Sequence, residues 1–331
     1  MRPCFRSMLL GLAALLVAAP AAAVVVSYTN NILTVFTDNA GTSAGMYWVK
    51  TGSAHPNPNQ NVIYDSQTSY ITLRDVTAGE IWTDAGFAPS SNIPGFVSRS
   101  MQAAPAAVAV TNLPTGFRMT YTLPNWVVVQ DVVVNGTTLA DTNVRQSVTV
   151  TNTSAVSRSY GVRYMWDWEI AGNDSSVFRT RNPDGTFTNV FIGFNSPGFQ
   201  AFEEQDTLVN PTFSVFGTVG GGSLVPAPTT PERVAYVSWG DFESAPWDFA
   251  ITGSNSDSAT VHYWGYAAPL VLAPAASRTF VEYISTNPTS VGVGPATPSA
   301  TQVPTLSQWA LFALIGLVVL LGMRFARPRG I

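Results

Sequence analysis

The sequence predicts an all-β fold, a large β-sandwich or layered antiparallel sheets, between a cleavable N-terminal signal peptide and one C-terminal transmembrane helix. Between residues 24 and 286, short runs rich in Val, Thr, Tyr, Phe and Trp are bounded by Gly, Pro, Asn or Asp, which is typical of strands. No stretch of this region sustains the 3.6-residue apolar period of an amphipathic helix. Each end of the chain carries an apolar run next to arginines.

The N-terminal segment 1–23 is predicted to be a signal peptide. An apolar run at 8–19 follows two arginines, and Ala21 and Ala23 supply an A-x-A site, so signal peptidase should cut after the second alanine. A retained anchor is the alternative, but the run is short for a membrane span. The one cysteine, Cys4, leaves with this peptide, which excludes disulfides and thiolate chemistry in the mature chain.

The region 24–286 is predicted to be one all-β extracytoplasmic domain, and two sandwiches meeting near residue 140 are the alternative. In chain order, strands are expected at 32–36, 46–50, 62–64, 71–74, 117–123, 126–134, 144–151, 160–170, 190–194, 233–239, 259–266 and 279–285. Asn135-Gly136 and Asp184-Gly185 are turn signals. The Gly- and Pro-rich segment 217–231 is expected to form a long flexible loop within the domain.

The charge of the predicted ectodomain excludes some classes of partner. Five of the 16 basic residues lie in the two terminal segments, whereas all 20 acidic residues lie between them, which leaves a net charge of about −9. Such a surface disfavours nucleic acid and anionic lipid as partners.

The densest candidate site is the strand expected at 160–170. A period of two places its aromatic residues on one face and Arg163, Asp167 and Glu169 on the other. We expect this polar face to be solvated, with Arg163 neutralising the carboxylates. In the alternative, Asp167 and Glu169, about 7 Å apart along the strand, act as the paired carboxylates of a glycosidase.

The turn after this strand could add metal ligands. Together with the two strand carboxylates, Asn173 and Asp174 offer oxygen atoms that suit calcium, although the spacing is not that of an EF-hand and such turns usually bond their own backbone. No other cofactor is expected.

Aromatic and histidine side chains offer further candidates. Trp82 and Trp247 lie beside polar loop residues and are the tryptophans most expected to be exposed for stacking on a sugar. His55 and His262 are expected to have packing or surface roles. No motif of a serine hydrolase, zinc protease, P-loop or dinucleotide-binding fold occurs.

The C-terminal segment has the order of a sorting signal. A Pro/Thr/Ser/Gly stalk at 287–302 leads into segment 303–331, which contains a predicted transmembrane helix at 306–325. The motif before and at the start of this helix consists of Val303, Pro304, Thr305, Leu306 and Trp309, and the residues expected to stop transfer on the cytoplasmic side are Arg324, Arg327 and Arg329.

These residues resemble the IPTL-CTERM tails of Gram-negative bacteria, with Val303 in place of the usual Ile. The resemblance implies recognition by an exosortase-type membrane sorting enzyme and cleavage near the motif. It covers the tail alone and leaves the ectodomain unassigned.

These observations together predict an exported bacterial surface or extracellular-matrix protein. Its N-terminus lies outside, its C-terminal helix holds it in the cytoplasmic membrane, and cleavage then transfers it to the cell surface or releases it. The ectodomain is expected to be a binding or structural module without enzymatic activity, with extracellular polysaccharide as a candidate partner. The alternative is a secreted polysaccharide-active enzyme that uses Asp167 and Glu169.

Overall fold

The computed structural model describes residues 24–41, 44–65, 68–83, 93–181, 185–221, 223–243, 245, 247–254 and 256–292. The predicted signal peptide with Ala21 and Ala23, most of the stalk, and the tail 303–331 with its helix lie outside the described residues. Among the residues that are described, no helix has the length and apolar character needed to cross a membrane.

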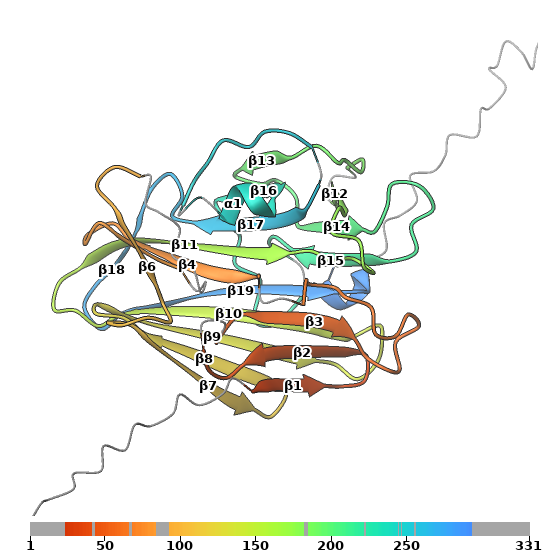
Figure 1. Cartoon of the computed structure of the whole chain (residues 1–331), viewed down its shortest axis with the longest axis horizontal. Helices are drawn as coiled ribbons and strands as arrows, with labels where there is room; N and C mark the ends of the chain where they lie inside the picture. Colours follow the sequence, from red (N-terminus) through yellow and green to blue (C-terminus); the bar gives the residue numbers. More distant parts are fainter. Residues whose placement is uncertain are drawn as a thin grey trace, which may run out of the picture. The chain divides into compact units, whose positions relative to one another are not determined.

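The described residues form three β-sheets, so the prediction of layered antiparallel sheets is confirmed. The small sheet is formed by β1 (Val25–Thr29), β2 (Leu33–Asp38) and β3 (Tyr47–Thr51). The sheet named here the β10 sheet has the order β12 (Val177–Thr180), β14 (Ala201–Gln205), β15 (Ser214–Thr218), β19 (Ser277–Ser285), β10 (Asn143–Asn152), β9 (Trp126–Asn135), β8 (Gly116–Thr122) and β7 (Ala107–Leu113). Figure 1 shows β10, β9, β8 and β7 following β19 in this order.

The other large sheet is named here the β11 sheet. It has the order β13 (Ile192–Asn195), β16 (Arg233–Ser238), β17 (Ser258–Trp264), β11 (Arg158–Asp167), β4 (Tyr70–Asp75), β5 (Glu80–Thr83) and β6 (Val97–Ser100), and β18 (Leu270–Leu272) also pairs with β11. Among the paired strands described, only β5 and β6 run parallel.

The main core lies where buried side chains of both large sheets meet. In β9, Trp126, Val128, Gln130 and Val132 are buried, whereas the residues that alternate with them are half-buried, because successive strand residues point to opposite faces. The predicted aromatic face of β11 also belongs to this core, since Trp166 and Trp168 are buried against the side chains of the β10 sheet. The burial of these large apolar surfaces stabilises the sandwich.

The opposite face of the β11 sheet is covered as well, which contradicts the predicted solvated polar face. The short helix α1 (Trp239–Glu243) and the segment after it pack Phe242 and Trp247 against Met165 of β11. Arg163 is fully buried and donates hydrogen bonds to the carbonyl oxygens of Ala245 (3.0 Å) and Trp247 (2.8 Å). Arg163 therefore satisfies backbone carbonyls and forms no ion pair with the carboxylates of its own strand.

The globule continues beyond the boundary expected at residue 286. The 3₁₀ helix η1 (Pro288–Val291) buries Val291 against Phe216 and Tyr283 on the outer face of the β10 sheet. The segment 217–231 is also held in place, because the Tyr283 hydroxyl donates to the carbonyl oxygen of Pro226 (2.7 Å) and the Thr229 N–H to that of Val281 (2.8 Å). The expectation of a flexible loop is wrong where these bonds tie it to β19.

Candidate functional site

A pocket of about 210 Å³ lies at the end of β11 and the start of β17. Its lining residues are Tyr64, Thr68, Asp167, Asp174, Trp239 and Asp257. Two of the three carboxylates, Asp167 and Asp174, belong to the sequence-predicted set, and the structure brings them together with a third.

Backbone hydrogen bonds bring the separate segments of the pocket together. The Trp168 N–H donates to the carbonyl oxygen of Ser258 (3.0 Å), and the Ser258 N–H donates to that of Asp174 (2.7 Å). The Trp239 N–H donates to the carbonyl oxygen of Asp257 (3.0 Å), which attaches the start of α1 to the same place. Backbone hydrogen bonds at the ends of β11 and β17 therefore position the three carboxylates.

Asp167 is the buried member of the group, with 3% of its surface exposed. Its Oδ1 atom is buried and makes no well-formed hydrogen bond with any described residue, although the nearby Thr68 hydroxyl acts to lower its pKa. Burial outweighs this effect and raises the pKa of Asp167 well above its usual range, and the negative charges of Asp257 and Asp174 raise it further. Asp167 therefore keeps its proton at pH values where an exposed aspartate is ionised.

The other two carboxylates of the pocket are partly exposed. Burial is the main cause that raises the pKa of Asp257 to about 6, and the charges of Asp174 and Glu243 add to it. Burial also raises the pKa of Asp174, whose Oδ1 atom likewise has no hydrogen-bond partner among the described residues. Because the three groups repel one another's charge, they do not all ionise together as the pH rises.

The remaining residues of the predicted calcium set are used elsewhere. Glu169 does not line the pocket and accepts a hydrogen bond from the Asn61 side chain. Asn173 donates to the carbonyl oxygen of Asp206 and accepts from the Ser175 N–H (2.9 Å), which is a turn-stabilising role. In the described part of the chain, no three or more acidic, His or Cys side chains form a group that could hold a metal ion.

Both tryptophans expected to be exposed are buried, so that expectation is wrong. Trp82, on β5, is 1% exposed and belongs to the main core. Trp247 is 2% exposed, because it packs edge-on against Tyr263 (5.5 Å between ring centroids) under the segment that covers the β11 sheet. Neither indole can stack on a ligand in this structure.

The sequence patterns did not indicate four lining residues of the pocket, which are Tyr64, Thr68, Trp239 and Asp257. Asp257 precedes the predicted strand 259–266, but only the antiparallel pairing of Asp167 with Ala259 brings it to the end of β11. That pairing joins residues about 90 positions apart, and no local pattern in the sequence encodes it.

A second group of carboxyls is sealed between the two large sheets. Glu204 of β14 accepts hydrogen bonds from the hydroxyls of Thr260 (2.8 Å) and Ser176 (2.9 Å). Glu282 of β19 contacts Nδ1 of His262 of β17, which gives this histidine the packed role expected for it. Burial raises the pKa of both glutamates, that of Glu204 to about 8. These groups have no access to solvent, so we assign them a structural role.

Comparison with known proteins identifies the tail. The pattern of the IPTL-CTERM motif matches residues 301–329, so the chain carries this C-terminal sorting signal. The signal indicates an extracytoplasmic, membrane-anchored protein and implies processing by an exosortase-type enzyme. No curated protein matches the chain.

Several solved structures resemble the fold of the ectodomain. A proposed aldose 1-epimerase of Escherichia coli K12 is 10% identical, with a TM-score of 0.45, over 80% of this chain and 99% of that one. A galactose mutarotase-related enzyme of Lactobacillus acidophilus is 10% identical, with a TM-score of 0.44, over 82% and 100% of the two chains. A protein of Synechocystis sp. PCC 6803 is 8% identical, with a TM-score of 0.43, over 81% and 98%.

These comparisons contradict the prediction of a binding or structural ectodomain without enzymatic activity. The resemblance is to proteins that are themselves named as enzymes of sugar chemistry. At such low identity and TM-score, the likeness defines neither reaction nor residues, so the following proposal is built from the pocket itself.

Proposed function

We propose that the ectodomain is a carbohydrate-active enzyme that uses acid–base catalysis by Asp167 together with Asp174 or Asp257. The observation that carries this proposal is the convergence of three carboxylates on one pocket, in which the buried Oδ1 atom of Asp167 makes no well-formed hydrogen bond with any described residue. Buried polar atoms normally have partners, so an unpaired one in a pocket is accounted for if a substrate supplies the missing bond.

The environments of the carboxyl groups support distinct roles. Asp167 retains its proton because of burial, so it can donate that proton to the acetal oxygen of a sugar as a general acid. Asp174 and Asp257 are partly exposed and ionise more readily, so either can accept a proton as the general base. Inverting cleavage of a glycosidic bond uses one acid and one base in this way. Opening of a sugar ring likewise moves one proton onto the ring oxygen and takes another from the anomeric hydroxyl.

The size and lining of the pocket favour a small sugar unit. Its volume of about 210 Å³ is below the range of roughly 300–1,000 Å³ typical of drug-sized ligands. Trp239 and Tyr64 add aromatic surface beside the carboxylates. The expected substrate is therefore a single sugar ring at the end of a saccharide, or a free monosaccharide.

The decisive experiment is turnover on a panel of reducing sugars and oligosaccharides, followed by NMR of the anomeric protons. Asp167→Asn should lower kcat/KM by about 10²–10⁴-fold, because it removes the general acid. Glu169→Gln is the matched control, since Glu169 lies two residues away but does not line the pocket, and it should retain activity within about tenfold. Equal losses in the two variants, or no turnover by the unmodified chain on any sugar, would refute the proposal.

The termini complete the proposal for cellular location. We infer that signal peptidase cleaves after Ala23, that the helix at 306–325 holds the protein in the cytoplasmic membrane, and that Arg324, Arg327 and Arg329 remain in the cytoplasm. An exosortase-type enzyme would then cleave near Val303–Trp309 and deliver the protein to the cell surface or the medium.

A further inference from the structure

A second pocket, of about 350 Å³, lies at the other end of strands β16 and β17. Glu232 precedes β16 and Trp264 ends β17, whereas Trp239 and Asp257 of the carboxylate pocket lie at the opposite ends of the same strands. Strands of six and seven residues place the two pockets roughly 20 Å apart. The two are therefore separate sites on one sheet.

Arg278, at the start of β19, supplies a cation to this second pocket. It is exposed and has no carboxylate partner among the described residues, while its guanidinium lies 5.4 Å from the ring of Phe280. Its positive charge acts on the buried Tyr160, whose pKa burial raises to about 12. In an ectodomain of about −9 net charge, such an unpaired guanidinium is a specific place for an anion.

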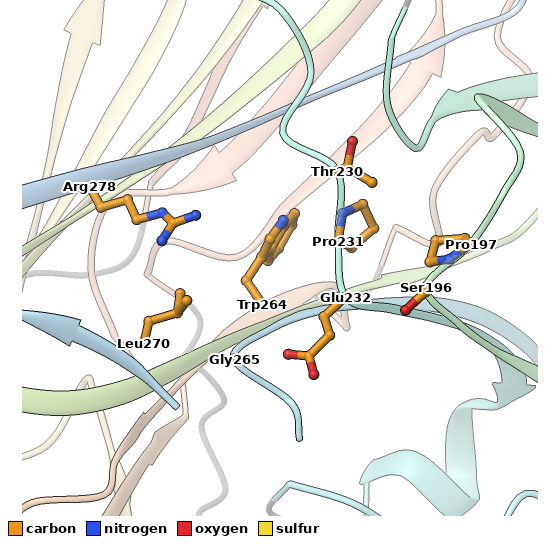
Figure 2. A pocket seen from close by; sticks show the side chains of 9 residues that line it. All are labelled: Ser196, Pro197, Thr230, Pro231, Glu232, Trp264, Gly265, Leu270 and Arg278. Carbon is orange, nitrogen blue, oxygen red and sulfur yellow. The ribbon is translucent and has the colours of Figure 1, made fainter. Parts of the chain in front are cut away.

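Glu232 supplies fixed hydrogen-bond acceptors beside this cation. Its two carboxylate oxygens accept bonds from the backbone N–H groups of Tyr266 (2.7 Å) and Ala267 (3.0 Å). Each oxygen retains a lone pair that can accept a ligand hydroxyl. Figure 2 shows the Arg278 guanidinium and the Glu232 carboxylate flanking Trp264.

The rest of the lining is apolar. The Trp264 indole N–H donates to the carbonyl oxygen of Thr229 (3.0 Å), and this tryptophan is 4% exposed, so it forms part of the pocket floor and offers no polar atom to a ligand. Pro197, Pro231 and Leu270 complete this apolar surface. A ligand that satisfies every group here carries a carboxylate, several hydroxyls and a compact ring with C–H faces.

We propose that this pocket binds a uronic acid unit of an acidic polysaccharide. Arg278 pairs with the sugar carboxylate, Glu232 accepts its hydroxyls, and the half-buried Pro197 and Leu270 contact the C–H face of the ring. The volume of about 350 Å³ suits one such unit, and the distance from the carboxylate pocket makes it an accessory site that holds the polymer near the enzyme. That the bound carboxylate belongs to a sugar rests on the proposed function. That the pocket binds an anion rests on Arg278 alone and is independent of that function.

The test is isothermal titration of the full-length chain with trigalacturonate and with its methyl ester, in which each carboxylate is replaced by a neutral ester group. The acid should bind at least about tenfold more tightly than the ester, because a charge-assisted bond to Arg278 is lost in the ester. Arg278→Gln should remove this preference. Arg118→Gln is the matched control, because it deletes an exposed arginine that pairs with Asp131 (2.6 Å) outside the pocket, and it should retain the preference.

Four results would overturn the inference. The first three are equal binding of acid and ester, an unchanged preference in Arg278→Gln, and loss of binding in Asp167→Asn, which would assign the sugar to the carboxylate pocket. Tighter binding of glutamate than of galacturonate, both as free monomers, would assign the second pocket to an amino acid instead. If Asp167→Asn binds the acid normally while no sugar is turned over by the unmodified chain, the proposed function fails and this binding site stands.

Discussion

Glu204 makes folding stability depend on pH in a way that one substitution can isolate. The side chain is fully buried on β14, its oxygens accept bonds from the Thr260 and Ser176 hydroxyls, and no cation pairs with it among the described residues. Burial raises its pKa from 4.5 to about 8. Between these values the folded chain holds a proton that the unfolded chain has released.

The sign and size of the effect follow from this difference in bound protons. A raised pKa in the folded state contributes stability that is present below pH 4.5 and is lost as the pH rises through about 8. The free energy of unfolding attributable to Glu204 should therefore fall by about 1.4 kcal/mol per pH unit between these limits. Other buried carboxyls add slopes of the same sign, so the quantity to measure is the difference between two variants.

Glu204→Gln replaces the protonated acid by a neutral side chain of the same shape. At pH 5 it should change the free energy of unfolding by less than about 1 kcal/mol, and its advantage over the unmodified chain should then grow by about 1.4 kcal/mol per pH unit up to about pH 8. Urea unfolding followed by tryptophan fluorescence at pH 5, 6, 7 and 8 measures both curves.

The control is Glu203→Gln, which alters the neighbouring carboxylate that pairs with Arg179 (2.6 Å) and Arg181 (2.9 Å). This variant should have a lower free energy of unfolding than the unmodified chain, and that free energy should still fall as the pH rises. Parallel curves for Glu204→Gln and the unmodified chain would show that Glu204 is ionised in the folded state, and the reasoning from burial would then be wrong.

Three further predictions test the other assignments. Trp247→Ala should lower the free energy of unfolding by about 3–5 kcal/mol, because it leaves a cavity over the β11 sheet; a loss below 1 kcal/mol in urea unfolding would contradict its burial. The rate on a sugar substrate should rise with pH as Asp257, with a pKa of about 6, loses its proton, and fall again when Asp167 does; a rate that is flat from pH 4 to 9 would exclude this acid–base pair. Mass spectrometry of the mature protein should find a C-terminus near Val303–Trp309, and an intact Ile331 in every cell fraction would exclude processing.

The strands that the sequence predicted well are those with strong local patterns. The valine-rich runs 126–134 and 144–151 define β9 and β10, and Gly136, with a φ of +82°, begins the turn between them as predicted. By contrast, β14 contains the acidic run Phe202 to Gln205, which resembles a polar loop. Its carboxylates can be buried because Arg179 and Arg181 form ion pairs with Glu203. The hydroxyls of two further residues donate hydrogen bonds to Glu204.

The candidate site could be predicted only in part, for a related reason. Asp167 and Asp174 were found because they lie in one short segment of unusual composition. Asp257 required the pairing of β11 with β17, and Trp239 required α1 to fold back over the sheet. The period of two correctly separated the faces of β11, but it does not tell whether one or both faces are covered.

The covering layer therefore explains both the error in the sequence prediction and the chemistry of the site. If the outer face of β11 were solvated, Asp167 would be an ordinary ionised aspartate with Arg163 as a neighbour. Because α1 and the segment after it bury that face, Arg163 bonds to the carbonyl oxygens of Ala245 and Trp247, and Asp167 has no cationic partner among the described residues. Burial without a counter-charge is the condition that keeps a carboxyl protonated near neutral pH. The same segment that packs Trp247 over the sheet thus creates the proposed general acid at its edge.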